Sequence, residues 1–125
     1  MDVQACSFTI NSANPDALHA FYREIVGLKP LPERGERVFN LNGASFGIDG
    51  HDAISGPSNE PARSLLNFFV ADAKVECERM ETLGVDFIRK EGVEFWGGVI
   101  STFADLDGNL CQLIQYDPSR ARAEG

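Results

Sequence analysis

An internal repeat constrains the fold of this chain more than any other feature of its sequence. Asn14 and Asp72 each open a predicted helix and stand 58 residues apart, and the helices end at Gly27-Leu28 and Gly84-Val85, 57 residues apart. Each half reads strand, helix, strand, strand, strand, so the sequence predicts two βαβββ modules. A four-stranded sheet covered by one helix leaves its other face bare. We therefore expect an α+β fold in which the two modules enclose a cleft.

The repeat also divides the chain of 125 residues, which is short enough to form a single domain. The first module is predicted over 5–50 and the second over 64–116. Between them, 51–63 is rich in Gly, Pro, Ser and Asn and is predicted to be a linker. After Tyr116 the polar tail 117–125 has no apolar period and is expected to fray.

Alternation and turn residues predict the strands within each module. They are expected at 6–11, 28–31, 37–41, 45–49, 65–70, 85–88, 99–103 and 110–115. Asn42-Gly43 and Asp107-Gly108 join the last two strands of each module, and Asp107-Gly108 predicts a type I′ turn. The first helix should bury Leu18, Phe21, Tyr22 and Ile25, and the second Ala73, Cys77 and Met80.

Charge and cysteine content exclude several classes of function. The net charge of −8 leaves no basic stripe for nucleic acid and favours a cationic ligand over an anionic one. Three dispersed cysteines without a CxxC motif are typical of reduced thiols in the cytoplasm. Residues 1–8 lack the basic and apolar segments of a signal peptide, and no apolar run approaches the roughly 18 residues of a membrane span.

Four segments add a family resemblance: LHAFYREIVGL (18–28), NFFVADAKVECERMETLGVDF (67–87), FWGG (95–98) and FADLDGNLCQLIQ (103–115). With the repeat, they make the chain resemble the vicinal oxygen chelate superfamily, which includes glyoxalase I, the extradiol dioxygenases and the bleomycin-resistance proteins. One departure is Leu106, where the family hairpin usually has Pro. The resemblance implies the fold, whereas the chemistry depends on the residues of the site.

The resemblance also implies four inward-facing metal-ligand positions, which hold His or Glu in the metal-dependent members. They correspond here to Ser7, to the segment 47–49 with Asp49 as its only donor, to Leu65 and to Gln112. Serine, leucine and glutamine do not hold a cation that requires imidazole, thiolate or carboxylate ligands. We therefore expect the fold without a metal or other cofactor.

Candidate ligand-binding residues are polar anchors and aromatic walls of an apolar pocket. They are Ser7, Thr9, Asp49, Leu65, Asn67, Phe69, Phe95, Trp96 and Gln112. Phe39, Phe46, Phe69 and Phe103 are abundant for so short a chain, and some of them are expected to line the cavity. Asp49 and His51 are the acid–base candidates, although a loop role for His51 and core packing for Phe95 and Trp96 are the structural alternatives.

Other reactive side chains favour structural roles. His19 is expected at the edge of the first helix's buried stripe, and Cys6 and Cys111 on the helix-facing side of their strands, away from a base. Asp105 and Asp107 resemble part of a calcium loop, but no Glu stands at its twelfth position, which favours a hairpin turn.

The first hypothesis is a metal-free small-molecule binder similar to the bleomycin-resistance branch. It would sequester an apolar or aromatic ligand, with an aromatic cation stacked on Trp96 as one candidate. The alternatives are a metal-dependent lyase or dioxygenase with an atypical site, a metal-free isomerase or lyase that uses Asp49 or His51, and an interaction domain. A homodimer is expected, with no nucleic acid or membrane partner.

Overall fold

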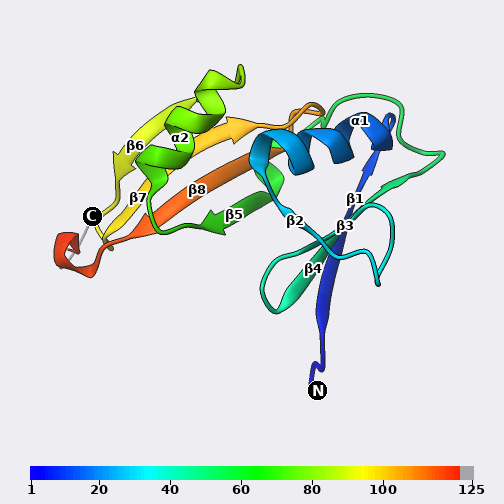
Figure 1. The fold of residues 1–125 in the computed structure, drawn as a ribbon, viewed down its shortest axis with the longest axis horizontal. Helices are drawn as coiled ribbons and strands as arrows, with labels where there is room; N and C mark the ends of the chain where they lie inside the picture. Colours follow the sequence, from blue (N-terminus) through cyan, green and yellow to red (C-terminus); the bar gives the residue numbers. More distant parts are fainter. Residues whose placement is uncertain (122–125) are drawn as a thin grey trace. The chain divides into compact units, whose positions relative to one another are not determined.

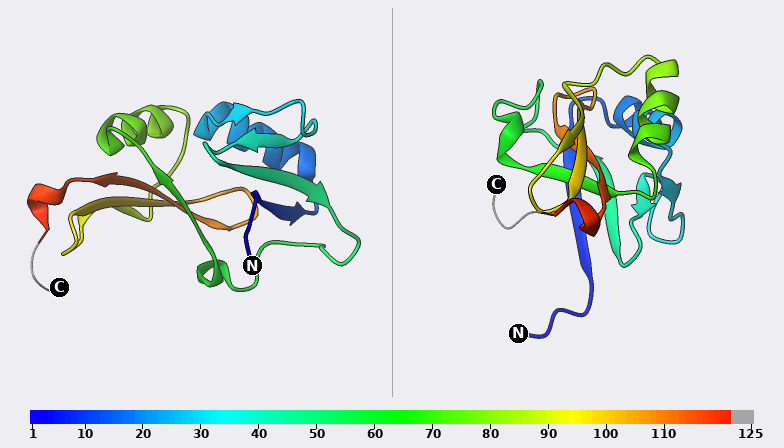
Figure 2. Two further views of the ribbon diagram at one scale, coloured as in Figure 1. Left: turned by 90° about the horizontal axis from the view of Figure 1, so that it is seen from below. Right: turned by 90° about the vertical axis from the view of Figure 1, so that its left-hand side faces the viewer.

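The computed structural model describes residues 1–121 and divides into two compact units, Met1–Pro57 and the chain from Ser58 onward. The boundary falls inside the predicted linker 51–63. Each unit contains one four-stranded sheet with a helix on one face (Figures 1 and 2). The two βαβββ modules and the α+β class are confirmed.

The first unit forms sheet A, with strand order β1-β4-β3-β2. Its elements are β1 (Cys6–Ser12), α1 (Pro15–Ala20), a π-helical turn (Phe21–Val26), β2 (Lys29–Pro30), β3 (Val38–Asn40) and β4 (Ala44–Gly50). β1 and β4 are parallel, and the other neighbours are antiparallel. At the predicted turn, Asn42 and Gly43 have φ values of 57° and 105°, the positive values that a type I′ turn requires.

The first helix begins and ends as its sequence predicts. The Asn14 side chain accepts a hydrogen bond from the Ala17 N–H (3.3 Å), Pro15 occupies the first turn, and Gly27 terminates the helix with φ 87°.

The last turn of this helix is wider than predicted. The Gly27 N–H donates to the Tyr22 carbonyl at 3.0 Å, five residues back, and the segment Phe21–Val26 is π-helical. The widened turn changes which face of the helix meets the sheet. Val26 is therefore buried, whereas Ile25, which the α-helical period placed in the core, is only half-buried.

The second unit forms sheet B, with strand order β5-β8-β7-β6. Its main elements are β5 (Leu65–Phe69), α2 (Ala73–Thr82), β6 (Arg89–Val93), β7 (Gly98–Ala104) and β8 (Leu110–Tyr116), with 3₁₀ turns at Pro61–Arg63 and Pro118–Arg120. The Asp72 side chain caps α2 by accepting from the Val75 N–H, and Ala73, Cys77 and Met80 are its buried stripe. In the predicted frayed tail, Asp117 caps the turn Pro118–Arg120, and 122–125 lie outside the described residues.

Two local predictions in the second unit are wrong. The strand expected at 85–88 lies at Arg89–Val93, because β6 is the sheet edge, where charged residues replace the apolar pattern used to find strands. The β7–β8 connection is also no two-residue type I′ turn, because Asp107 does not have positive φ. The Gly108 N–H donates to the Asp105 carbonyl (3.1 Å) in a five-residue loop. Leu106 occupies a turn position that favours Pro, so either residue fits the loop.

Each unit has a separate apolar core between its helix and its sheet. In the first unit, Tyr22, Phe39 and Phe46 are fully buried, and the Tyr22 and Phe46 rings meet edge to face at 5.0 Å. In the second, Phe103 and Cys111 are fully buried. Strand alternation places Phe39, Phe46 and Phe103 on the helix side, in the cores, so of the four phenylalanines considered for a cavity only Phe69 is exposed. In the described part of the chain, every helix is too short or too polar to span a membrane.

Candidate functional site

The predicted polar residues of the first unit gather on the face of sheet A that its helix does not cover, called here open face A. Parallel pairing sets Ser7 opposite Ser45, Thr9 opposite Gly47 and Asn11 opposite Asp49. These six residues share one face because strand side chains alternate. Ser7, Thr9 and Asp49, proposed from sequence, are thus brought together in one unit.

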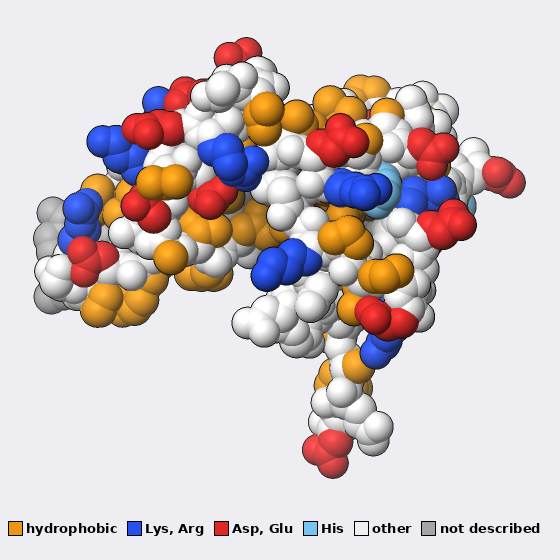
Figure 3. Space-filling view, viewed as in Figure 1, with side chains coloured by type: hydrophobic (Ala, Val, Ile, Leu, Met, Phe, Trp, Pro, Cys, Tyr) orange, Lys and Arg blue, Asp and Glu red, His pale blue; other side chains and the backbone are white. Residues whose placement is uncertain are grey.

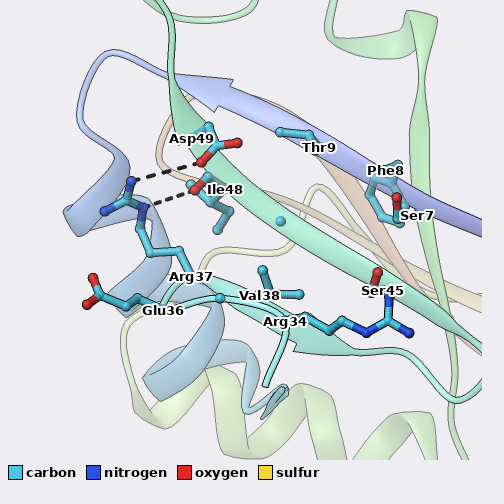
Figure 4. Close-up of a pocket in the computed structure, with 12 residues that line it drawn as sticks. Ser7, Phe8, Thr9, Arg34, Glu36, Arg37, Val38, Ser45, Ile48 and Asp49 are labelled. Carbon is cyan, nitrogen blue, oxygen red and sulfur yellow. Dashed lines mark hydrogen bonds and ion pairs between the residues drawn. The ribbon is translucent and has the colours of Figure 1, made fainter. Parts of the chain in front are cut away.

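A pocket of about 460 Å³ lies on open face A (Figure 4). The strands supply Ser7, Thr9, Val38, Ser45, Gly47 and Asp49, the connection before β3 adds Arg34, Gly35, Glu36 and Arg37, and Phe8 and Ile48 complete the lining. The lining is mainly polar and offers three hydroxyl groups. Arg34 and Glu36 were not identifiable as site residues from the sequence, because they lie in a connection without a hydrophobic period.

Arg37 fixes one end of this pocket. Its Nε donates to the Ile48 carbonyl at 2.9 Å, one terminal nitrogen lies 3.1 Å from Asp16 Oδ1, and the other lies 4.0 Å from Asp49 Oδ1. The guanidinium therefore connects α1 to β4 and lies near the Asp49 carboxylate. In Figure 4 the other Asp49 oxygen points toward Thr9, into the pocket.

The charge of the pocket differs from that of the whole chain. Two arginines, Arg34 and Arg37, and two acids, Glu36 and Asp49, line it, so their formal charges balance although the chain carries −8. On the face seen in Figure 3, Lys and Arg side chains are interspersed with Asp and Glu. The net negative charge of the chain therefore does not by itself select a cation in this pocket.

The corresponding residues of the second unit lie on open face B, the face of sheet B away from α2. Leu65, Asn67 and Phe69 alternate along β5, and Asn67 pairs with Gln112. Gln112 Nε2 lies 3.4 Å from Thr102 Oγ1, a long hydrogen bond across β8 and β7. Phe69 is 66% exposed, so open face B carries an accessible aromatic ring beside these amides.

Trp96 has a neighbour that sequence reasoning did not identify. Its ring stacks on Tyr116 with centroids 6.2 Å apart and planes 26° apart. The indole lies over Gly98, which pairs with Tyr116 across β7 and β8. Phe95 is 42% exposed, and Trp96 is half-buried. The available signal is the position of Tyr116 at the end of β8, opposite Gly98, two residues after Trp96.

The family's metal positions do not form a fitting donor set in either unit. By register, Asn67 pairs with Gln112 as Thr9 pairs with Gly47, so the counterpart of Gln112 is Gly47, which has no side-chain donor. Ser7 pairs with Ser45, and Leu65 pairs with Leu110. Within residues 1–121, no group of three His, Cys, Asp or Glu side chains is arranged to hold a metal ion.

The two histidines lie apart from the pocket lining. His51 is exposed in the loop after β4, and its Nδ1 accepts from the Ala53 N–H at 3.0 Å. His19 stacks on Phe39 with centroids 5.2 Å apart, as expected for a residue at the edge of the buried stripe. Burial, reinforced by the charges of Arg23 and Arg37, lowers the pKa of His19.

The three cysteines are free thiols. Cys77 and Cys111 are buried, and desolvation raises the pKa of Cys77. Cys6 follows the helix-facing phase of β1 but is exposed, because it lies at the first residue of the strand. The Asp105 carboxylate accepts from the N–H groups of Asp107 and Asn109, both at 2.9 Å, which gives the acidic pair a role in the hairpin loop.

Comparison with solved structures gives the same fold at low sequence identity. A protein of unknown function from Agrobacterium tumefaciens matches with TM-score 0.74 and 20% identity, covering 94% of this chain and 97% of that one. The antibiotic-binding protein TnmS3 from Streptomyces sp. CB03234 matches with TM-score 0.67 and 20% identity, covering 93% and 98%. A superfamily member from Sphaerobacter thermophilus gives 0.67 and 19%, covering 92% and 98%.

A comparison with curated proteins gives no significant match. The family model of the Glyoxalase/Bleomycin resistance protein/Dioxygenase superfamily matches residues 6–113, which include both sheets nearly in full. Together with the two βαβββ units, this match shows that the chain belongs to the Glyoxalase/Bleomycin resistance protein/Dioxygenase superfamily.

Proposed function

We propose that this protein binds a small organic molecule in the pocket on open face A, without a metal. The observation that carries the proposal is the pocket itself, about 460 Å³ and lined by hydroxyls, charged side chains and Val38 on a face that the unit's own helix leaves uncovered. That volume is within the range of small-molecule sites. Rigid strands hold Ser7, Thr9 and Asp49, so binding does not require these anchors to be ordered first.

Binding is favoured over metal-dependent lyase or dioxygenase chemistry by the donors present. Ser7 and Gly47 in the first unit, like Leu65 and Gln112 in the second, offer neither the carboxylate nor the imidazole ligands that such a metal needs. Acid–base chemistry without a metal would fall to Asp49, because His51 is outside the pocket lining. Asp49 lines the pocket, and its carboxylate could accept hydrogen bonds from a cationic group of a ligand.

The second unit has aromatic residues of its own on which an apolar or aromatic ligand could stack, independently of the pocket on open face A. Trp96 and Tyr116 form a stacked pair, and Phe69 presents a 66% exposed ring. A flat ligand stacked on such rings would gain about 0.5–1.5 kcal/mol for each aromatic contact beyond the area it buries. The antibiotic-binding protein TnmS3 shares the fold, which supports small-molecule binding as a use of this architecture.

Native mass spectrometry of the protein purified without a chelator tests this proposal. We expect a metal-free species, and the same spectrum tests the predicted homodimer. An added organic mass that is lost on denaturation would identify the ligand class directly. One transition metal per subunit would overturn the proposal and favour the metal-dependent lyase or dioxygenase.

A charge reversal then tests the pocket. Asp49→Lys should weaken binding of the retained ligand, or of a hit from a thermal-shift screen, by about tenfold, because it replaces an attractive carboxylate with an ammonium group. Asp86→Lys, an exposed acid of the second unit, is the matched control and should leave affinity unchanged. Equal affinity of Asp49→Lys and wild type would count against this pocket as the binding site.

A further inference from the structure

We propose that the pocket on open face A takes a zwitterionic ligand, with its carboxylate against Arg34 and its ammonium group against Asp49. The inference rests on the proposed function and specifies its substrate class. It differs from the sequence-based expectation of a cation, because the pocket has a positive end as well as a negative one.

The positive end is formed by Arg34. Its guanidinium points toward Ser45, with Ser7 on the neighbouring strand (Figure 4). Arg34 and Ser45 also line a second hollow of about 230 Å³. Glu36 points away from the Arg34 guanidinium in the same view, and no ion pair joins Arg34 to a carboxylate among residues 1–121. A guanidinium beside two hydroxyls can bind a carboxylate through several hydrogen bonds.

The negative end is formed by Asp49, at the opposite end of β4. Arg37 holds one of its oxygens, while Asp16 and the Ile48 carbonyl occupy the rest of that guanidinium. The second oxygen of Asp49 points toward Thr9 (Figure 4). Arg37 lines the pocket, but its nitrogens are directed at Ile48, Asp16 and Asp49, so the group left to accept from the ligand is the Asp49 carboxylate with a neighbouring hydroxyl.

The strand sets the distance between the two ends. Ser45 and Asp49 lie four residues apart on one face of β4, which corresponds to about 13 Å between their Cα atoms. Arg34, which faces Ser45, and Asp49 both extend into the pocket. A ligand that contacts both would therefore have roughly 10 Å between its two charges. Between the ends lie Thr9, Gly47 and Val38, which are uncharged and suit an apolar chain or ring. Gly47 has no side chain to fill this middle section, and an added Cβ would contact Thr9 and Val38.

Three probes of one length test the inference: 8-aminooctanoate, octanoate and octylamine. An extended chain advances about 1.2 Å per bond, so 8-aminooctanoate separates its charges by roughly 10 Å. Binding is measured by amide chemical-shift titration, which reports both affinity and location. We expect 8-aminooctanoate to bind about tenfold more tightly than either single-charge probe, with shifts at the amides of Ser7, Ser45 and Asp49.

Substitutions at two exposed residues, Arg34 and Asp49, test the two ends of the pocket separately. Arg34→Gln should lower the affinity for 8-aminooctanoate to about that of octylamine and leave octylamine unchanged. Asp49→Asn should lower it to about that of octanoate. Lys29→Gln, an exposed cation outside the pocket, is the matched control and should change none of the three affinities.

The outcomes distinguish this inference from the proposed function. Octylamine binding as tightly as 8-aminooctanoate, or an unchanged affinity in Arg34→Gln, would overturn the zwitterion and leave a binder of cations. Binding of none of the three probes would also overturn it. An organic mass retained in the native spectrum, with the Asp49→Lys effect, would then still support the proposed function.

Discussion

Replacing Gly98 with Ala should release the only tryptophan from its place on sheet B. An added Cβ at Gly98 would lie 2.6 Å from the indole Cζ2, and closer still to two other ring atoms. The indole therefore has to move, and its stack on Tyr116 is lost. Because the φ angle of Gly98 is not positive, the backbone itself accepts alanine, so the effect arises from the displaced ring.

The expected cost follows from the interactions that the ring loses. An aromatic pair contributes about 0.5–1.5 kcal/mol beyond its buried area, and the exposed Tyr116 places this pair in the lower half of that range. We expect the free energy of unfolding to fall by about 1 kcal/mol and Tm by about 4 °C. The emission maximum of Trp96 should shift to longer wavelength, because the displaced indole is more exposed to water.

The assay combines tryptophan fluorescence with thermal unfolding followed by circular dichroism. Gly56→Ala is the matched control, because an added Cβ there has no neighbour within 4 Å and should change neither signal. If Gly98→Ala matched Gly56→Ala in both emission maximum and Tm, the packing of Trp96 over Gly98 would be refuted.

Three further predictions follow from the structure. Asp105→Ala should lower the free energy of unfolding by about 2 kcal/mol, because the Asp107 and Asn109 N–H groups lose their carboxylate partner. Urea unfolding measures this free energy, and a value equal to that of the wild type would refute the prediction. The pKa of His19 is lowered in the folded protein, so as pH falls through about 6.5 the unfolded chain binds a proton first and the free energy of unfolding should decrease. Urea unfolding across pH 5–8 measures this decrease. His19→Gln should remove the contribution of His19 to it. Brief alkylation of the native protein should modify Cys6 alone, because Cys77 and Cys111 are buried. If peptide mapping showed Cys77 modified as fast as Cys6, the burial of Cys77 in the core of the second unit would be contradicted.

Turn and capping residues made much of each unit predictable from sequence. Asn14 and Asp72 cap their helices, and Gly27 terminates the first with positive φ, because these roles depend on a few adjacent residues. Strand alternation likewise placed Ser7, Thr9 and Asp49 on one face. Such properties are local and require no knowledge of distant contacts.

Other features depend on neighbours that the sequence does not reveal. The edge position of β6 permits the charged segment Arg89–Val93 to be a strand, and the hydrogen bonds to the Asp105 carboxylate select a five-residue loop over a two-residue turn.

The sequence by itself determined the two βαβββ modules and showed that the family's metal positions carry poor ligands. Only the tertiary structure brought Arg34 and Arg37 to the strands that hold Ser45 and Asp49, and laid Trp96 against Tyr116. Net charge describes the whole chain, whereas binding depends on charges within a few ångströms, and folding alone decides which of them meet.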